Sequence, residues 1–148
     1  MLISSTSVKK LAEYVENRDE VFCSGLFLSA RWMVISQLDR LGIQMIVLPD
    51  RDSAEYCAAD LYHLIEGDRV YFLPDSGKNL ERSNYKSSLG VQRTSAIGKI
   101  LEYKEGEQMI IVTYPSALEE IIPEKGKISG SLLKLAAGDE KPYEEIKE

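Results

Sequence analysis

The stretch SGLFLSARW, residues 24–32, lies where a nucleotide-hydrolysing enzyme would carry its phosphate loop, between an apolar run and an amphipathic segment. A phosphate loop has the pattern G-x-x-x-x-G-K-[ST]. Its backbone N–H groups surround the phosphates, while the Lys and the hydroxyl reach the γ-phosphate and Mg²⁺. Here Gly25 matches the first glycine, but Ala30 stands at the second, Arg31 at the Lys and Trp32 at the Ser/Thr. The pattern is therefore that of a degenerate phosphate loop.

These substitutions remove most of the chemistry of such a loop. Leu28 places a bulky side chain where the backbone should approach phosphate, and Trp32 has an indole N–H but no oxygen with which to bind Mg²⁺. Arg31 keeps a positive charge, and a helix N-terminus offers free N–H groups, so weak anion binding stays open. The favoured interpretation is a turn into a helix with Ser29 as N-cap. We expect no cofactor at Gly25, Leu28, Ser29, Ala30, Arg31 and Trp32.

Two Leu-Pro-Asp sequences are also to be compared with an ATPase site, because an apolar strand that ends in an acid can hold Mg²⁺ in an ATPase. Pro49 and Pro74 precede the two acids, and Asp50 and Asp75 are placed where a turn or a helix cap needs a short acceptor. Capping is the prediction for both. The chain offers no nucleophile elbow and no paired carboxylates, and its one histidine falls on the polar side of a predicted helix. We therefore predict no catalytic residue and no metal site, and a binding or scaffolding domain rather than an enzyme.

Composition limits the class of protein. With 148 residues, 44% hydrophobic and 28% charged, the chain fits one globular domain. It has neither a membrane-length apolar run nor the apolar centre of a signal peptide, which predicts a cytoplasmic protein without membrane contacts. A net charge of −6 argues against holding DNA by its phosphates. Cys23 and Cys57 form no metal or disulfide framework, and both are predicted to be buried.

The spacing of apolar residues predicts the helices and strands that must position these residues. Helices are predicted at 7–17, 29–41, 52–65 and 89–104, with a short one after a capping box of Ser116 and Glu119. Gly42 is predicted to end the second helix in a left-handed conformation, and Gly98 to permit close packing of the fourth. Strands are predicted at 20–24, 43–50, 69–75 and 109–115. Of these, 43–50 is apolar throughout, as in a strand covered on both faces. Strands alternating with helices predict a three-layer α/β domain with a parallel sheet.

The remaining segments are polar. The loop 76–88 carries Lys78, Arg82, Tyr85 and Lys86, for which a solvated loop is the favoured interpretation and a minor docking surface the alternative. Composition changes after Pro123. We expect residues 1–122 to form the degenerate, phosphate-loop-like α/β domain, and residues 123–148 to be a linker and the truncated start of a following module.

The order of these features resembles the N-terminal, UvrB-like region of bacterial transcription-repair coupling factors. The similarity covers roughly residues 21–135 and is most specific in the degenerate loop 25–32, in PDRDSAEYCAADL at 49–61 and in TYPSALEEIIP at 113–123. It implies a degenerate P-loop NTPase fold, RecA/helicase-like and similar to domain 1 of UvrB, that has lost nucleotide binding.

The resemblance also implies a role. The whole protein would be an ATP- and Mg-dependent DNA translocase that displaces stalled RNA polymerase and recruits UvrA in nucleotide excision repair. Its motor and its contacts with DNA and RNA polymerase would lie in downstream domains, and UvrA would bind the module that begins near 132–148. This fragment would be a non-catalytic scaffold that packs on other domains of the parent protein. UvrB carries a tyrosine-rich hairpin that enters damaged DNA, whereas residues 76–88 contain only Tyr85, so DNA wedging is not expected.

Two other hypotheses stay open. One is a working NTPase in which Arg31 replaces the Lys. It is disfavoured because the two side chains are not interchangeable at such a site and because Trp32 removes the metal ligand. The other is a small-ligand domain whose pocket lies at the carboxyl ends of the parallel strands. That pocket would be lined by Gly25, Pro49, Asp50, Pro74, Asp75 and Tyr114.

Overall fold

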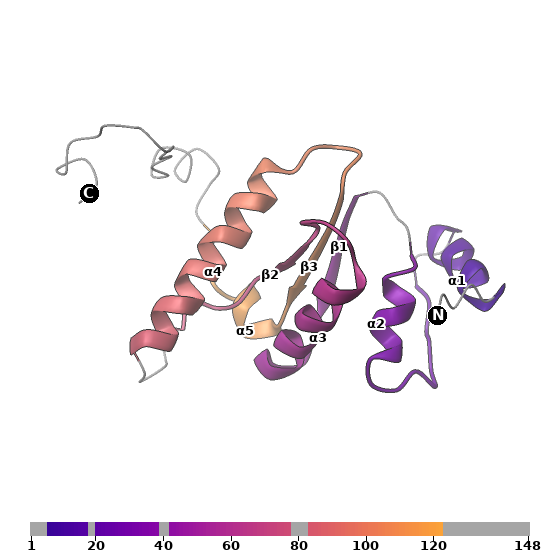
Figure 1. Ribbon diagram of the computed structural model, residues 1–148, viewed down its shortest axis with the longest axis horizontal. Coiled ribbons are helices and arrows are strands. Elements are labelled where there is room, and N and C mark those ends of the chain that lie inside the picture. The colour runs from indigo at the N-terminus through magenta and orange to yellow at the C-terminus, as the bar shows by residue number, and fades with distance from the viewer. Residues whose placement is uncertain (1–5, 18–19, 39–41, 78–82, 123–148) are drawn as a thin grey trace.

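The computed structural model describes residues 6–17, 20–38, 42–77 and 83–122, the side chains of Ser7 and of residues 83–87 excepted. Its centre is a three-stranded parallel sheet of order β1-β3-β2 with helices on both faces (Figure 1). The strands are β1 (Gly42–Val47), β2 (Val70–Phe72) and β3 (Gln108–Thr113). The helices are α1 (Thr6–Asn17), α2 (Ala30–Ile35), α3 (Arg51–Leu64), α4 (Ser83–Glu102) and α5 (Pro115–Leu118). The predicted α/β class is thereby confirmed.

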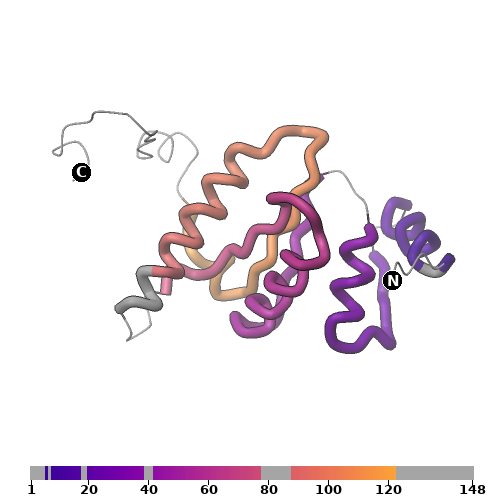
Figure 2. The backbone as a smooth tube through the Cα atoms, in the orientation of Figure 1, coloured from indigo at the N-terminus to yellow at the C-terminus, as the bar shows by residue number. Residues whose placement is uncertain are grey.

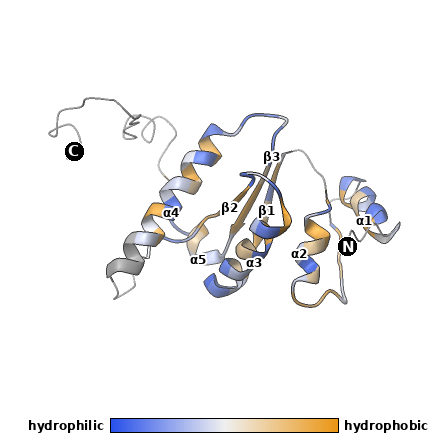
Figure 3. Cartoon of the chain, viewed as in Figure 1, coloured by the Kyte–Doolittle hydropathy of each residue, from blue (hydrophilic) through white to orange (hydrophobic). Residues whose placement is uncertain are grey.

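The central strand β3 separates two apolar clusters. Ile110 and Val112 point to one face and pack with Trp32 of α2 and with α3. Met109 and Ile111 point to the other face and pack against α4. In Figure 3 the three strands carry the hydrophobic colours. Because both faces of β3 are covered, its unbroken apolar sequence predicts its position correctly.

The sequence of helix α3 accounts for both its buried face and its N-cap. Ala54, Cys57, Ala58 and Leu61 recur at helical spacing and are all buried against the sheet. Asp50 caps the helix, because its Oδ1 accepts a hydrogen bond from the backbone N–H of Ser53 at 2.8 Å. The predictions of a buried Cys57 and of capping by Asp50 are both confirmed.

Strand β1 corrects one prediction. Its residues alternate between partly buried and exposed, so the strand is not covered on both faces. Ile43, Met45 and Val47 are 48%, 53% and 51% exposed, respectively. They lie beside Met109 and Ile111 of β3 on the face that carries α4, but among the described residues the apolar cluster under α4 is formed with β2 and β3 and does not include them. An apolar run therefore identified a strand without identifying its place at the edge.

The predicted strand 20–24 is not part of the sheet. The segment has no strand structure, and among the described residues β1 pairs with β3 alone. Its Phe22 is 92% exposed, and Cys23 is exposed rather than buried as predicted. Apolar composition favours a strand, but only a partner strand can satisfy its backbone. Figure 2 shows the tube of this segment near α1 and α2, beyond the β1 side of the sheet.

Several element boundaries also differ from the predictions. Helix α2 ends at Ile35, and Gly42, whose φ is +105°, opens β1 instead of closing a helix. Helix α4 begins at Ser83, so the second half of the predicted loop is helical. A Cβ at Gly98 would meet no atom within 4 Å, so this glycine serves no close packing.

The capping box at Ser116 is wrong. The N-cap of helix α5 is Tyr114, two residues before Ser116, and Pro115 is the first residue of the helix. Proline favours this position because its fixed φ suits a first helical residue, whose N–H would in any case lack a partner within the helix. In the described part of the chain, no helix is long and apolar enough to cross a membrane. The module predicted at 123–148 lies outside the described residues.

Candidate functional site

The degenerate loop does not occupy the position that a phosphate loop needs. No strand of the sheet leads into it, and α2 has only six residues. Gly25 and Leu28 both have positive φ, +80° and +49°, and the Leu28 side chain is exposed. Ala30 is the first residue of α2. The loop therefore turns the chain into α2 without following a strand of the sheet.

The two loop residues that stand at the Lys and Ser/Thr positions have local roles. Trp32 is only 7% exposed and belongs to the core between α2 and α3. The guanidinium of Arg31 lies 4.7 Å from the centre of the Trp32 ring, and its Nε donates to the carbonyl of Leu28 at 3.4 Å. Ser29 does not cap α2 with its side chain; its hydroxyl donates to Asp60 of α3 at 2.6 Å. The predicted N-cap position at Ser29 is thus confirmed, but its hydroxyl bonds to Asp60 instead of to a backbone N–H of the first turn.

At the carboxyl ends of the strands, four side chains form what we call the carboxyl-end network: Arg51, Asp75, Tyr114 and Ser116. Nη2 of Arg51 lies 2.8 Å from both carboxylate oxygens of Asp75, and Nε of Arg51 donates to the Tyr114 hydroxyl at 3.0 Å. The same hydroxyl accepts the backbone N–H of Asp75 at 3.0 Å. Ser116 donates to Asp75 at 3.3 Å. The network joins residues that follow all three strands.

Electrostatics in this network favour charged forms of Arg51 and Asp75. Partial burial works to raise the pKa of Asp75, but hydrogen bonds from Arg51 and from the backbone of Gly77 outweigh it and hold that pKa below its ordinary value. Burial works to lower the pKa of Arg51, whereas the bonds to Tyr114 and Asp75 raise it. Burial raises the pKa of the Tyr114 hydroxyl. Asp75 thus accepts a turn bond from Gly77, as predicted, and also forms an ion pair, which was not predicted.

A second cluster, which we call the Arg93 network, lies beside the first. Arg93 of α4 is 6% exposed and donates to the carbonyls of Pro74, Ala117 and Glu120 at 2.7, 3.1 and 3.2 Å. Its Nε lies 3.2 Å from the Glu120 carboxylate, which also accepts the N–H and the hydroxyl of Ser76. This network fixes the end of α5 against β2 and α4. This network was not predicted from the sequence, although an arginine on the apolar face of α4, four residues before Ile97, is a signal for a buried cation.

The predicted carboxyl-end pocket is thus only partly assembled. Pro74, Asp75 and Tyr114 come together, and Asp50 lies next to them as the cap of α3, whereas Gly25 belongs to the loop before α2. The polar groups of the carboxyl-end network are bonded to one another. Among the described residues, no buried side-chain nitrogen or oxygen lacks a partner, and no group of three or more His, Cys, Asp or Glu is placed to hold a metal ion. The arrangement can act as a rigid connection between strand ends.

The predicted docking surface can be placed only in part. Lys78 and Arg82 lie outside the described residues. Tyr85 and Lys86 belong to the first turns of α4, and their side chains are not described.

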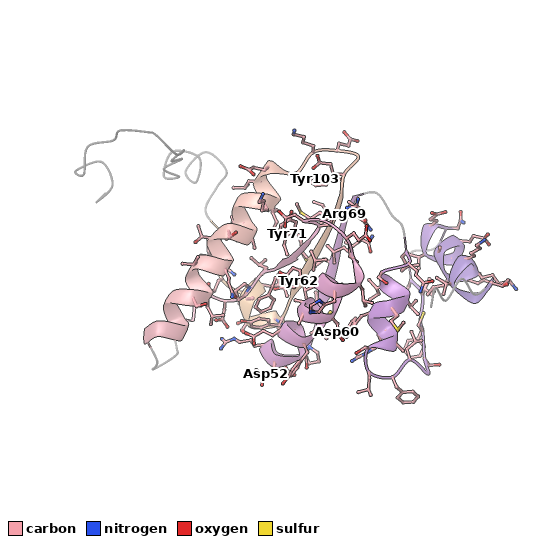
Figure 4. All side chains as sticks on the ribbon, viewed as in Figure 1. Asp52, Asp60, Tyr62, Arg69, Tyr71 and Tyr103 are labelled. Atoms are coloured by element: carbon pink, nitrogen blue, oxygen red, sulfur yellow. The ribbon has the colours of Figure 1, made fainter. Side chains whose placement is uncertain are left out.

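A cavity of about 520 Å³ lies elsewhere, between α3 and α4 along the outer edge of β2. Ala58 and Ala96 are small residues on the two helices, and Leu89 and Phe72 also line it. The Tyr62 hydroxyl accepts a hydrogen bond from the backbone N–H of Phe72 at 3.3 Å. This tyrosine therefore satisfies a backbone donor that faces outward from the edge strand β2. Figure 4 labels Tyr62 on α3 and Tyr71 on β2, which face this groove. No local pattern in the sequence indicates the cavity, because its existence depends on the distance between two helices.

Comparison of the sequence with models of known protein families found no match. Searches among curated proteins and among solved structures found no match either. Any assignment of function therefore rests on the residues and their geometry.

Proposed function

We propose that this chain is a non-catalytic scaffold domain: the degenerate P-loop NTPase-like, UvrB-related N-terminal part of a cytoplasmic transcription-repair coupling factor. The observation that carries the proposal is the state of the loop. Trp32 is packed in the core and Arg31 is stacked on it, at the two positions where a phosphate loop needs a metal-binding hydroxyl and a mobile Lys. A loop of this kind favours a structural role over nucleotide chemistry.

The networks at the strand ends support the scaffold role. Two of the stretches that carry the resemblance, 49–61 and 113–123, supply Arg51 and Tyr114 to the carboxyl-end network and Glu120 to the Arg93 network. Together these bonds fix α5, after which the chain continues into residues 123–148. A fixed exit suits a domain that positions a following UvrA-binding module. RNA polymerase and DNA would be contacted by further domains of the parent protein.

Fluorescence of the single tryptophan tests the proposal directly, because Trp32 lies in the loop. Titration with ATP and Mg²⁺ into the millimolar range is expected to leave the emission spectrum unchanged, with calorimetry as a check. Saturable binding that disappears in Arg31→Ala would overturn the proposal in favour of an atypical NTPase. A chain extended through the following module is expected to bind UvrA, and failure of a folded extended chain to do so would also contradict the assignment.

The cavity beside β2 supports a second candidate, a small-ligand-binding domain. Its volume of about 520 Å³ and its aromatic and apolar lining fall in the range of ligand pockets. Thermal-shift screening with planar aromatic compounds tests it. A hit that raises the melting temperature of the parent chain, but not that of Ala96→Leu, which fills the groove, would favour this candidate. The absence of hits at millimolar concentration would count against it.

A further inference from the structure

We propose that the outer edge of β1 pairs with β1 of a second copy of this chain, in an antiparallel arrangement about a two-fold axis at Met45. The inference goes beyond the proposed function, because it concerns self-association rather than the role of the domain in a larger protein. It follows from the backbone of β1, the exposed face beside it and the symmetry of its sequence.

The backbone of β1 has an open edge. The N–H of Gly42 donates to Glu107 and the N–H of Leu48 donates to Thr113, so the even-numbered residues of this strand bond to β3. The odd-numbered residues Ile43, Met45 and Val47 therefore direct their N–H and C=O groups to the opposite side. In the part of the chain that the structure describes, no strand pairs with that side. An edge of this kind is a template for another strand.

The side chains of the same three residues form an apolar stripe. Ile43, Met45 and Val47 point to the face that carries α4, and each is about half exposed. Strand β1, GIQMIV, contains no charged residue and no proline, the usual devices that keep an edge strand from pairing. The stripe continues the buried row of Met109 and Ile111 on the neighbouring strand. A strand added at this edge would extend the sheet and cover the stripe.

A second copy fits because the stripe is self-complementary. With the axis at Met45, Ile43 of one copy faces Val47 of the other, and the two Met45 residues face each other. All of these residues direct backbone groups outward, so each facing pair can exchange two hydrogen bonds. Their side chains meet on one face of a continuous sheet, as an isologous interface requires. Three half-exposed side chains bury roughly a few hundred Å² per copy, less than the ~800 Å² of a standard interface, so we expect a reversible dimer.

Cysteine crosslinking tests the register. In a Cys23→Ser background, which removes the exposed thiol, Met45→Cys is expected to give a disulfide-linked dimer on mild oxidation, because directly opposed Cα atoms lie about 5.5 Å apart. The matched control is Ile43→Cys in the same background. Its two thiols would be separated by roughly four residues of strand, about 14 Å, and should stay reduced.

Sedimentation equilibrium of the full 148-residue chain provides the second measurement. Met45→Lys is expected to weaken self-association at least tenfold, whereas Val91→Lys, which introduces the same charge at a more exposed apolar site on α4, should leave it unchanged. A chain that is monomeric at millimolar concentration would overturn the inference, as would a dimer that persists in Met45→Lys. A monomer in which residues 20–24 protect β1 from hydrogen exchange would show that the edge is taken by the chain itself.

Discussion

Arg51 and Asp75 form an ion pair that joins the first residue of α3 to the loop leaving β2. Nη2 of Arg51 lies 2.8 Å from each carboxylate oxygen, and both side chains are mostly buried, at 22% and 14% exposure. The pair is completed by the Tyr114 hydroxyl, which follows β3. Three segments far apart in the sequence are thus held at one edge of the sheet by a single guanidinium.

Removing that guanidinium should destabilise the fold. Arg51→Met keeps the apolar stem but leaves the Asp75 carboxylate partly buried without its main partner, so we expect the free energy of unfolding to fall by about 1–3 kcal/mol. Urea denaturation followed by circular dichroism measures the change. Arg69→Met, which loses only an exposed bond to Gln108, serves as control and should stay within about 0.5 kcal/mol of the parent. Equal losses in the two variants would show that the carboxyl-end network stabilises the fold no more than an exposed hydrogen bond does.

Asp75 should also make stability depend on acid pH. Its pKa is lower in the folded chain than the ordinary value of about 3.9, so its hydrogen bonds stabilise the fold above that pH. The stabilisation is lost as pH falls from about 4 through the folded pKa. Asp50 acts in the same direction, because the N–H and the hydroxyl of Ser53 lower its pKa.

The expected result is a decline in the free energy of unfolding below about pH 4 that is shallower in Asp75→Asn than in the parent. Glu105→Gln removes an exposed carboxylate from the turn after α4 and should retain the parental slope. Denaturation curves between pH 2.5 and 7, as an approximate working range for acid titration, measure the difference. A parental slope in Asp75→Asn would refute the assignment.

Arg93 should be the most costly arginine to remove. Arg93→Met would leave the Glu120 carboxylate and the carbonyls of Pro74 and Ala117 without their shared donor, and breaking a buried pair in this way costs about 3–5 kcal/mol. Arg93→Lys should recover only part of that loss, because an ammonium group lacks the fork that reaches several acceptors.

The surface pair of Lys99 and Asp68, at 3.6 Å with both side chains well exposed, provides the comparison. Lys99→Met is expected to change the free energy of unfolding by about 1 kcal/mol or less. If the two substitutions had similar effects in chemical denaturation, the Arg93 network would not be a structural centre of the fold.

The two cysteines should differ in reactivity. Burial raises the pKa of Cys57 to about 12, with a further contribution from Asp60, while Cys23 is exposed. Because the thiolate is the reactive form, a native chain treated with a thiol reagent at pH 8 should label Cys23 rapidly and Cys57 only on unfolding. Cys23→Ser should therefore abolish the fast phase. Fast labelling in that variant would mean that α3 is not packed as described.

Local sequence determined the elements whose partners lie within a few residues. The spacing of Ala54, Ala58 and Leu61 predicted the buried face of α3, and Asp50 predicted its cap, because both depend on bonds between neighbours in the chain. The unbroken apolar run of β3 predicted a covered strand for a similar reason. Ile97, Ile100 and Leu101 of α4 likewise recur at helical spacing and pack in the cluster on the other face of β3.

The tertiary structure alone decided which strands pair and which side chains meet. EVFCS and IQMIV are similarly apolar, yet β1 pairs with β3, whereas residues 20–24 form no strand and pair with none of the described strands. Arg51 and Asp75 are 24 residues apart, and Arg93 and Glu120 are 27 apart, so no local pattern could bring them together. Strand pairing and ion pairs of this kind depend on how distant segments close on one another. Hydrophobic periodicity carries no information about that closure, which is why the sequence predicted the elements but not the edge of β1 or the networks at the strand ends.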